Sequence, residues 1–270
     1  MGGMRYLHLE RQGNEMDLKN ACFIVTGGAS DLGAATVRRL VADGARVGIA
    51  DVAINAGSEL AQAFGAAAQF VQTDVTDEGS ARMAVRVAEE RFGPVNGLVN
   101  CAGVAPGEKI LGGQGLHQRA VFKRALAINL TDSFNMIRFA AQAMRQGAPN
   151  AEGERGVIVN TASATEFDGQ IGQAPYAASK AGVVGMTLPI ARELARYGIR
   201  VMTIASGIFE TPMLLDMPRA VQDTLGQSVP FTERPGRASE FAALVAHICE
   251  NFMLNGEVIR LDGALRTAAN

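Results

Sequence analysis

The sequence predicts an α/β fold, a single doubly wound domain whose seven-stranded parallel sheet is covered by helices on both faces. Two observations predict it. From about residue 20 onward, short apolar runs alternate with segments of helical periodicity. The strand-like runs are apolar throughout rather than on alternate residues, which is typical of a parallel sheet buried on both faces. A chain of 270 residues with 48% hydrophobic residues is long enough to form the core of such a domain.

The elements follow one another in regular order. Strands are predicted over 21–28, 46–51, 68–75, 95–103, 156–163, 198–207 and 256–263. Helices are predicted over 32–44, where Gly44 marks the end, and over 55–65, 77–93, 122–144 and 174–197, with further helical stretches before the last strand. The polar segment 145–156 is predicted to be a surface loop and not a domain boundary, so residues 17–270 are expected to form one domain.

Residues 1–16 are expected to be a disordered extension of this domain. They show no apolar periodicity, and they lack the apolar stretch of a secretory signal. Arg5 and Arg11 are balanced by Glu10 and Glu15, which argues against a transit peptide. Met16 is therefore a candidate natural start.

The bulk composition excludes several classes of function. A net charge of -2 and a pI of about 6.0 argue against binding to nucleic acid or to an anionic membrane. No apolar run approaches the roughly 20 residues of a membrane helix. The odd number and scatter of the cysteines argue against a disulfide framework and favour a cytoplasmic location. The histidines show no metal-ligand spacing, so no metal site is expected. The cysteines are Cys22, Cys101 and Cys249, and the histidines are His8, His117 and His247.

A glycine-rich turn, TGGASDLG at 26–33, joins the first strand to the first helix. Glycine lets the backbone approach a pyrophosphate, and the helix N-terminus adds free N–H groups and a positive dipole end. An ordinary tight turn is the alternative, but the strand–turn–helix context favours a dinucleotide site. The turn residues expected at the cofactor are Gly27, Ser30, Leu32 and Gly33.

Asp51 ends the second strand, about 20 residues after the turn. A carboxylate at this place can accept hydrogen bonds from an adenosine ribose diol and would repel a 2′-phosphate. No Arg or Lys follows it closely, and Ser30 is not basic. A strand-end cap is the alternative, but the spacing favours binding of NAD over NADP.

Tyr176 and Lys180 are four residues apart on a predicted helix and so share a face. An ammonium about 4 Å from a phenol favours the phenolate by roughly 4 kcal/mol at an effective dielectric of 20, about three pKa units. The pair is therefore a candidate general acid/base, with a surface packing pair as the alternative. Ser163, at the end of the fifth strand, is a candidate holder of a substrate oxygen. Asn129 is a further candidate, although such residues are more often structural.

Taken together, these residues resemble the short-chain dehydrogenase/reductase family, over about residues 17–266. The matching pieces are TGGASDLG, Asp74-Val75, NCAG, Asn129, Ser163, YAASK and SGIFETPM. The resemblance implies a Rossmann fold and a nicotinamide cofactor. It implies that Ser163 holds the substrate oxygen, Tyr176 transfers the proton, Lys180 binds the nicotinamide ribose and Asn129 helps to hold a water that feeds protons to Lys180. It also implies cofactor contacts by Asp74 and Val75 at the adenine, by Asn100, Cys101, Ala102 and Gly103 behind the cofactor, and by Phe209 and Thr211 along the nicotinamide.

The segments 155–207 and 254–266 are more narrowly similar to the type II 3-hydroxyacyl-CoA dehydrogenases, also called 17β-hydroxysteroid dehydrogenases type 10. This implies NAD-dependent oxidation of a 3-hydroxyacyl-CoA by a homotetramer. A steroid or another secondary alcohol is the alternative substrate, and a catalytically inactive NAD-sensing or scaffold protein is the alternative of another class. Two positions depart from the family pattern. Asp31 replaces a glycine of the turn, and Ser206 replaces the proline that usually follows the sixth strand. The Asp31 side chain either faces the diphosphate site, where it would oppose NAD, or faces solvent, where it would only cap the helix.

Overall fold

The computed structural model describes residues 16, 18–113, 115–211, 214 and 218–266. Its centre is a sheet of seven parallel strands in the order β3-β2-β1-β4-β7-β8-β9. The strands are β1 (Cys22–Thr26), β2 (Arg46–Asp51), β3 (Ala68–Gln72), β4 (Val95–Asn100), β7 (Gly156–Ser163), β8 (Ile199–Ser206) and β9 (Val258–Leu261). The predicted doubly wound sheet is confirmed.

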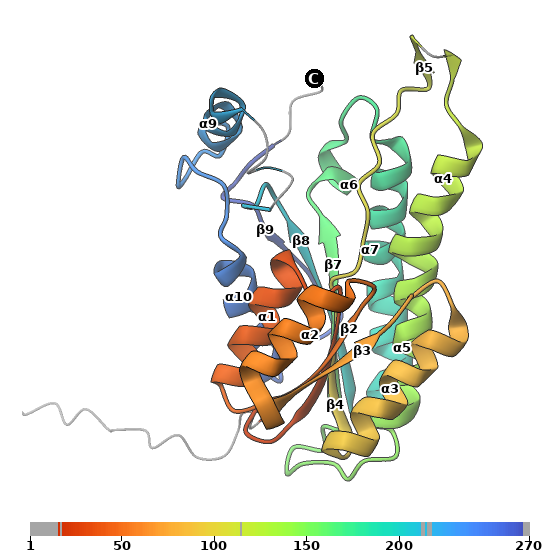
Figure 1. The fold of residues 1–270 in the computed structure, drawn as a ribbon, viewed down its shortest axis with the longest axis vertical. Coiled ribbons are helices and arrows are strands. Elements are labelled where there is room, and N and C mark those ends of the chain that lie inside the picture. Colours follow the sequence, from red (N-terminus) through yellow and green to blue (C-terminus); the bar gives the residue numbers. More distant parts are fainter. Residues whose placement is uncertain (1–15, 17, 114, 212–213, 215–217, 267–270) are drawn as a thin grey trace, which may run out of the picture.

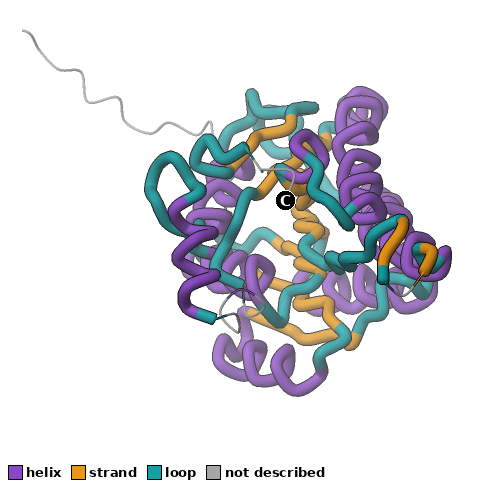
Figure 2. The backbone as a smooth tube through the Cα atoms, turned by 90° about the horizontal axis from the view of Figure 1, so that it is seen from above, coloured by secondary structure: helices purple, strands orange, loops and turns teal. Residues whose placement is uncertain are grey.

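Helices cover both faces of this sheet (Figures 1 and 2). On one face lie α1 (Asp31–Ala42), α2 (Ile54–Phe64) and α10 (Ala238–Glu250). On the other face lie α3 (Glu78–Phe92), α4 (Arg119–Leu126), α5 (Asp132–Met144) and α7 (Ala174–Leu194). The two apolar clusters of the core lie between these helical layers and the sheet, and Phe23 and Ile24, neighbours on β1, belong to opposite clusters. The alternation of side chains along a buried strand explains why these strands are apolar throughout.

The strand order reverses between β1 and β4, because β2 and β3 lie on one side of this pair and β7, β8 and β9 on the other. In open α/β sheets the crevice at such a reversal, beyond the carboxyl ends of the strands, is the usual ligand site. Every predicted site residue that follows a strand is thereby brought to one edge of the sheet.

The predicted helix over 122–144 is not continuous. The structure divides it into α4 and α5, joined by a π-helical segment, η2 (Ala127–Thr131). The wider turn of a π-helix breaks the regular helical ladder, and such segments often occur at functional sites. Asn129 lies at the centre of η2 and is fully buried.

Other short elements were not predicted from the sequence. An antiparallel hairpin of β5 (Leu111–Gly112) and β6 (Gly115–Leu116) projects beyond α4 (Figure 1). A short helix, α6 (Thr165–Asp168), follows β7, and single turns η1 (Gly65–Ala67) and η3 (Ala195–Tyr197) end α2 and α7. The helix α9 (Arg219–Gln227), which precedes α10, belongs to the helical stretches that were predicted before the last strand. Within the described residues, no helix is long and apolar enough to cross a membrane.

The expected N-terminal extension lies outside the described residues except at its last position. Met16 is only 7% exposed and packs into the same apolar cluster as Leu18 and Phe23. The packed chain therefore includes Met16, one residue earlier than the boundary expected from the sequence.

A buried ion pair joins the C-terminal part of the chain to the sheet. Arg200, on β8, places its Nε 2.6 Å from Glu154 Oε1, and both side chains are almost fully buried. The remaining guanidinium nitrogens donate to the main-chain carbonyls of Ile248, Cys249, Asn251 and Leu254. One cation thus pairs with one oxygen of a buried carboxylate and satisfies the end of α10 together.

Candidate active site

A cleft of about 1060 Å³ opens at the carboxyl edge of the sheet, at the point between β1 and β4 where the strand order reverses. The ends of β2 and β7, the turn before α1, η2, α7 and the segment after β8 contribute to its wall. Its size is that of a site for a large organic ligand.

The glycine-rich turn forms one wall of the cleft and needs glycine for steric reasons. Gly27 has a φ of 60°, and a Cβ placed on it would lie 2.7 Å from Ala102 N. A Cβ on Gly33 would lie 2.0 Å from Gly27 O. Gly27 therefore lets the turn pack closely against the loop after β4, and Gly33 lets the start of α1 pack closely against the turn.

Asp31 does not occupy the predicted N-cap position. The N-cap of α1 is Ser30, and Asp31 is the first helical residue, with a φ of 49° and therefore in the left-handed region. No side-chain hydrogen bond caps this helix. Of the two alternatives for Asp31, the N-cap is not observed, because the chain enters the helix one residue earlier than the sequence pattern indicates.

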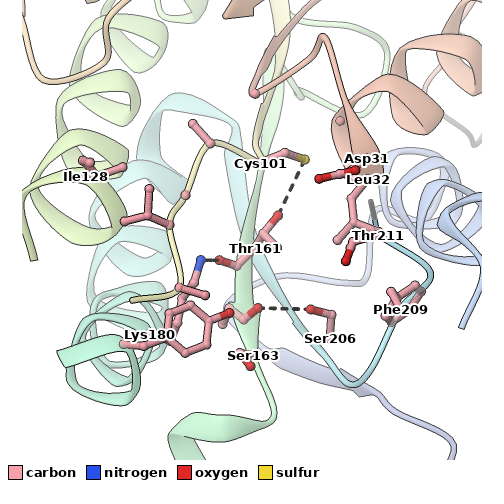
Figure 3. Close-up of a pocket in the computed structure, with 18 of the residues that line it drawn as sticks. Asp31, Leu32, Cys101, Ile128, Thr161, Ser163, Lys180, Ser206, Phe209 and Thr211 are labelled. Carbon is pink, nitrogen blue, oxygen red and sulfur yellow. Dashed lines mark hydrogen bonds between the residues drawn. The ribbon is translucent and has the colours of Figure 1, made fainter. Parts of the chain in front are cut away.

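The carboxylate of Asp31 instead faces the cleft, on the side of Cys101 (Figure 3). Partial burial raises its pKa, and the negative charge of Asp51 raises it further. The nucleotide end of the cleft thus carries two carboxylates, one of which stands where the turn normally has glycine.

Asp51 lies at the end of β2, as predicted, and is 9% exposed. Its Oδ2 accepts the N–H of Ala29 at 2.9 Å, and its Oδ1 accepts the N–H of Ala53 at 3.0 Å. These bonds join the end of β2 to the glycine-rich turn. Each carboxylate oxygen keeps a second lone pair, so the group can still accept hydrogen bonds from a ribose diol.

The residues expected along the rest of the cofactor divide into two groups. Asp74 and Val75 line the cleft after β3, and bonds from Thr76 to Asp74 Oδ1 lower the pKa of that carboxyl. Cys101, Ala102 and Gly103 also line the cleft. Asn100 does not: it is buried behind them, where its Nδ2 donates to Asn160 Oδ1 at 2.9 Å.

Ser163, Tyr176 and Lys180 converge on the opposite wall of the cleft, in agreement with the prediction that they act together (Figure 3 for Ser163 and Lys180). Ser163 ends β7, and the other two lie one turn apart on α7. The phenol of Tyr176 is within hydrogen-bonding range of the Ser163 hydroxyl. Lys180 Nζ donates to the main-chain oxygen of Thr161 at 2.8 Å and lies 5.8 Å from the centre of the Tyr176 ring.

The pKa values of this pair differ from the simple expectation. Burial lowers the pKa of Lys180 to about 8. The pKa of Tyr176 is raised, chiefly by burial and also by the charge of Glu166, against the opposing effect of the bond from Ser163. Lys180 is not among the groups that shift the pKa of Tyr176 in the protein without ligands, because its ammonium is bonded to Thr161 O and desolvation of the phenol dominates.

Asn129 lies behind Lys180 and does not line the cleft. Its Oδ1 accepts the N–H of Val104 at 2.8 Å, and its Nδ2 donates to Val104 O and to Ser179 Oγ, both at 2.9 Å. A Cβ on Gly103 would lie 3.2 Å from Asn129 Oδ1 and 3.5 Å from Lys180 Nζ. Asn129 thus fixes the loop after β4 against α7, next to the lysine.

The segment after β8 closes the remaining side of the cleft. Phe209 and Thr211 both line it, and the Phe209 ring packs edge-on against Phe241 with centroids 6.4 Å apart (Figure 3). Ser206 is the last residue of β8, and its hydroxyl donates to Ala162 O at 3.4 Å.

Sequence reasoning missed three residues of this site. Thr161 accepts the lysine ammonium, Thr165 Oγ1 accepts the Ser163 hydroxyl at 3.0 Å, and Glu166 Oε2 accepts the Ser163 N–H at 2.8 Å. Thr161 makes its contact through a main-chain oxygen, which neither its residue type nor the alternation of side chains along a strand reveals. Glu166 carried no signal either, because only the turn of α6 brings its carboxylate back to Ser163. In the described part of the chain, no group of three or more His, Cys, Asp or Glu side chains could hold a metal ion.

Comparison with known proteins agrees with this geometry. A family model described as short chain dehydrogenase matches residues 21–221. The chain is 51% identical over 251 residues to the 3-hydroxyacyl-CoA dehydrogenase type-2 of Drosophila melanogaster, covering 92% of this chain and 98% of that protein. It is 49% identical over 252 residues to the protein of the same name from Homo sapiens, covering 92% and 96%.

A solved structure is also similar to this chain. The crystal structure of 3-hydroxyacyl-CoA dehydrogenase type-2 from Mycobacterium avium superimposes with a TM-score of 0.90 at 40% identity, covering 93% of this chain and 98% of that one. The resemblance drawn from the sequence is confirmed. With its doubly wound sheet, its glycine-rich turn and the Ser163, Tyr176 and Lys180 wall, the chain is an oxidoreductase that belongs to the short-chain dehydrogenase family.

Proposed function

We propose that this protein oxidises the secondary alcohol of a 3-hydroxyacyl-CoA to the 3-oxoacyl-CoA, with NAD as the cofactor. The observation that carries the proposal is the convergence of Ser163, Tyr176 and Lys180 on one wall of a cleft whose opposite wall is the glycine-rich turn. The acyl-CoA substrate class is supported by the names of the similar proteins from Drosophila melanogaster and Homo sapiens. A steroid or another secondary alcohol, and a role without catalysis, have no comparable support.

The turn fits a dinucleotide. A side chain at Gly27 would clash with the backbone of the loop after β4, and one at Gly33 with the backbone of the turn itself, so only glycine keeps the turn in this shape. The backbone of Gly27, Ser30, Leu32 and Gly33 is assigned to the diphosphate. Asp51 is assigned to the adenosine ribose, Asp74 and Val75 to the adenine. Cys101, Ala102 and Gly103 are assigned to the face of the cofactor with Asn100 behind them, and Phe209 and Thr211 to the nicotinamide, beside Tyr176 and Lys180.

NAD is preferred over NADP in this proposal because of charge. Asp51 and Asp31 both carry carboxylates at the ribose end, and the lining residues next to Asp51 are Ala50 and Val52. A 2′-phosphate there would meet negative charge and no adjacent cation.

The protein's own groups supply the proton chemistry. The bound nicotinamide would accept the hydride from the carbinol carbon. Ser163 donates a hydrogen bond to the substrate oxygen, and the phenolate form of Tyr176 takes the hydroxyl proton. Lys180 stabilises that phenolate and binds the nicotinamide ribose, and Asn129 holds the loop at Val104 and supports proton supply to Lys180.

The test is the change of absorbance at 340 nm with 3-hydroxybutyryl-CoA and, for comparison, with simple secondary alcohols. We expect turnover with the CoA ester and NAD, with kcat/KM for NADP lower by at least a factor of ten. Equal or greater kcat/KM with NADP would contradict the assignment of Asp51. Turnover of the simple alcohols without turnover of the CoA ester would contradict the substrate class.

We infer further that residues 16–270 act as one domain after a dispensable extension over 1–15, and that the protein works as a cytoplasmic homotetramer. Exposed aromatic and aliphatic side chains on neighbouring helices support self-association, including Phe134 on α5 and Leu188 on α7. The described cysteines are unpaired, which suits a reducing compartment. Light scattering of the purified protein and fractionation of cells would test the assembly and the location.

A further inference from the structure

Glu166 is a carboxylate next to the proposed catalytic residues that the assignments above leave without a role. It lies on α6, three residues after Ser163. Its Oε2 accepts the backbone N–H of Ser163 at 2.8 Å, so the carboxylate turns back toward the end of β7. The hydroxyl of the same serine is bonded to Thr165 at 3.0 Å. Ser163 is thereby held at both its backbone and its side chain by the first turn of α6.

The second oxygen of Glu166 is buried and has no hydrogen-bond partner among the described residues. A buried, unpaired carboxylate oxygen is costly, and such a group is retained in a fold only where the rest of the structure compensates for it. The side chain does not line the cleft itself. It therefore acts on the substrate site through Ser163 and through its charge.

The charged groups that face Glu166 come from two other elements. Lys180 on α7 and Arg260 on β9 both lower the pKa of Glu166, against the larger effect of burial, which raises it. Arg260 is already paired with Asp168 at 2.6 Å and Asp262 at 2.7 Å. The negative charge of Glu166 is thus only partly neutralised, and it raises the pKa values of both Tyr176 and Lys180.

We propose that Glu166 is a positioning residue of this site: its carboxylate fixes Ser163 at the end of β7 and places a negative charge near the phenol of Tyr176 that disfavours the phenolate. The inference rests on the proposed function. A protonated phenol is the form that reduction requires, in which the phenol O–H bond breaks and the proton passes to the substrate carbonyl oxygen. In oxidation the alcohol O–H bond breaks and its proton passes to the phenolate, so oxidation needs the form that Glu166 disfavours.

The variant that separates charge from shape is Glu166→Gln, because the amide oxygen can still accept the Ser163 N–H. We expect the rise of kcat/KM for alcohol oxidation with pH to move down by about 0.5–1 pH unit in E166Q. Oxidation near pH 7 should become about threefold to tenfold faster. Reduction of the ketone at the same pH should not gain.

The matched control is Glu193→Gln, the same chemical change on α7. Glu193 lies 17 residues after Tyr176, about 25 Å along the helix at 1.5 Å per residue. E193Q should leave the pH profile where it is in the wild type. Glu166→Ala, which removes the acceptor for the Ser163 N–H, should also raise KM for the alcohol, a change that E166Q should not share.

A second readout does not depend on activity. With tyrosine labelled by ¹³C at Cζ, and the Tyr176 signal assigned by its loss in Y176F, the phenol can be titrated in the wild type and in E166Q. We expect a lower titration midpoint in E166Q. Indistinguishable midpoints in the two proteins would overturn the inference about Glu166, whether or not the enzyme turns over. A wild type that lacks dehydrogenase activity while the midpoints differ would overturn the proposed function and uphold this one.

Discussion

Asp31 combines two unfavourable features in a single residue, a left-handed backbone and a charge that faces the cleft. Its φ is 49°, a region that glycine adopts freely and Asp at some cost. A carboxylate about 5 Å from a phosphate is repelled by roughly 1–3 kcal/mol for effective dielectrics between 80 and 20. The residue therefore weakens binding of a dinucleotide without preventing it.

We predict that Asp31→Gly binds NAD about fivefold to 100-fold more tightly at low salt, because the repulsion is removed. Calorimetric titration at low and high salt would measure it, and the gain should shrink as salt increases. Asp31→Asn is the matched control: it removes the charge and keeps a side chain that tolerates the left-handed region. Equal NAD affinity of wild type and D31G would show that the carboxylate has no effect on the nucleotide.

Tyr176 is assigned as the general acid/base, and the prediction is specific to its hydroxyl. Tyr176→Phe should lower kcat/KM by about 10²–10⁴-fold while NAD binding changes little. Tyr197→Phe is a suitable control, since Tyr197 lies in η3, beyond the end of α7, and stacks with Arg145 and Arg196 away from the cleft. Substantial turnover by Y176F would remove Tyr176 from the mechanism.

Lys180 links the site to the stability of the fold through pH. Its folded-state pKa of about 8 lies below the unfolded value of 10.5, so between these values the unfolded chain binds more protons. Stability of the ligand-free protein should therefore rise with pH in this window. Compared with Lys180→Met, the wild type should gain about 1–2 kcal/mol of unfolding free energy between pH 8 and 9.5.

Urea unfolding of both proteins at the two pH values would measure this gain. If the difference in unfolding free energy between the wild type and K180M stays constant with pH, the ammonium is as well solvated in the folded protein as in the unfolded chain. An ordinary ion-paired lysine makes the free energy of unfolding fall as pH rises, so the rise expected here has the opposite sign. This opposite sign indicates that the site keeps the Lys180 ammonium at a cost to stability.

Among the elements, the turn from β1 to α1 depends most strictly on glycine. We predict that Gly33→Ala loses NAD binding by at least tenfold, because its Cβ would meet Gly27 O at 2.0 Å and only a shift of the backbone can relieve that contact. Gly185→Ala on α7 is the control, since a Cβ there meets no atom within 4 Å. G185A should instead stabilise the helix by about 1 kcal/mol.

Titration of each variant with NAD, together with thermal unfolding, distinguishes the two effects. A G33A protein that binds NAD normally would mean that the turn can open without loss of the cradle. Destabilisation by G185A would mean that another surface covers this face of α7 in solution.

The secondary-structure elements divide into those that the sequence predicts and those that it does not. The strands and most helices were predictable, because apolar runs and helical periodicity are local signals. The site wall was predictable at Ser163, Tyr176 and Lys180, because strand ends converge at one edge and residues four apart share a helix face.

The misses have physical causes. The π-helical segment around Asn129 has no local signature, since a helical period of 3.6 residues and a single wider turn give nearly the same apolar pattern. The raised pKa of Tyr176 and the position of Glu166 depend on burial, which arises only when α6, α7 and β7 are packed together. The N-cap of α1 was misplaced by one residue, within the ordinary uncertainty of a helix end.

At the scale of the whole molecule, the Arg200–Glu154 pair is predicted to be the most sensitive polar contact far from the cleft. Arg200→Met leaves a buried carboxylate and several buried carbonyls without a donor. We predict a loss of about 3–5 kcal/mol in the free energy of unfolding. Urea unfolding would measure it, with NAD binding of the folded fraction unchanged.

A double variant tests the reason for that loss. Adding Glu154→Gln to Arg200→Met removes the unpaired charge and should recover part of the stability. If E154Q lowers the free energy of unfolding of R200M by as much as it lowers that of the wild type, the two side chains act independently.

The same cation has a consequence for how the chain is made. Arg200 enters β8 early, whereas its carbonyl partners lie 48 to 54 residues later, at and beyond the end of α10. During synthesis at about 5–20 residues per second, β8 therefore waits several seconds for the carbonyls that accept its remaining guanidinium N–H groups, while Glu154 is already present. In that interval β8 is the last strand of the nascent sheet, and its guanidinium is only partly satisfied. Chaperone contacts on the ribosome are expected to concentrate there, and release from them should coincide with emergence of residues 248–261 from the exit tunnel.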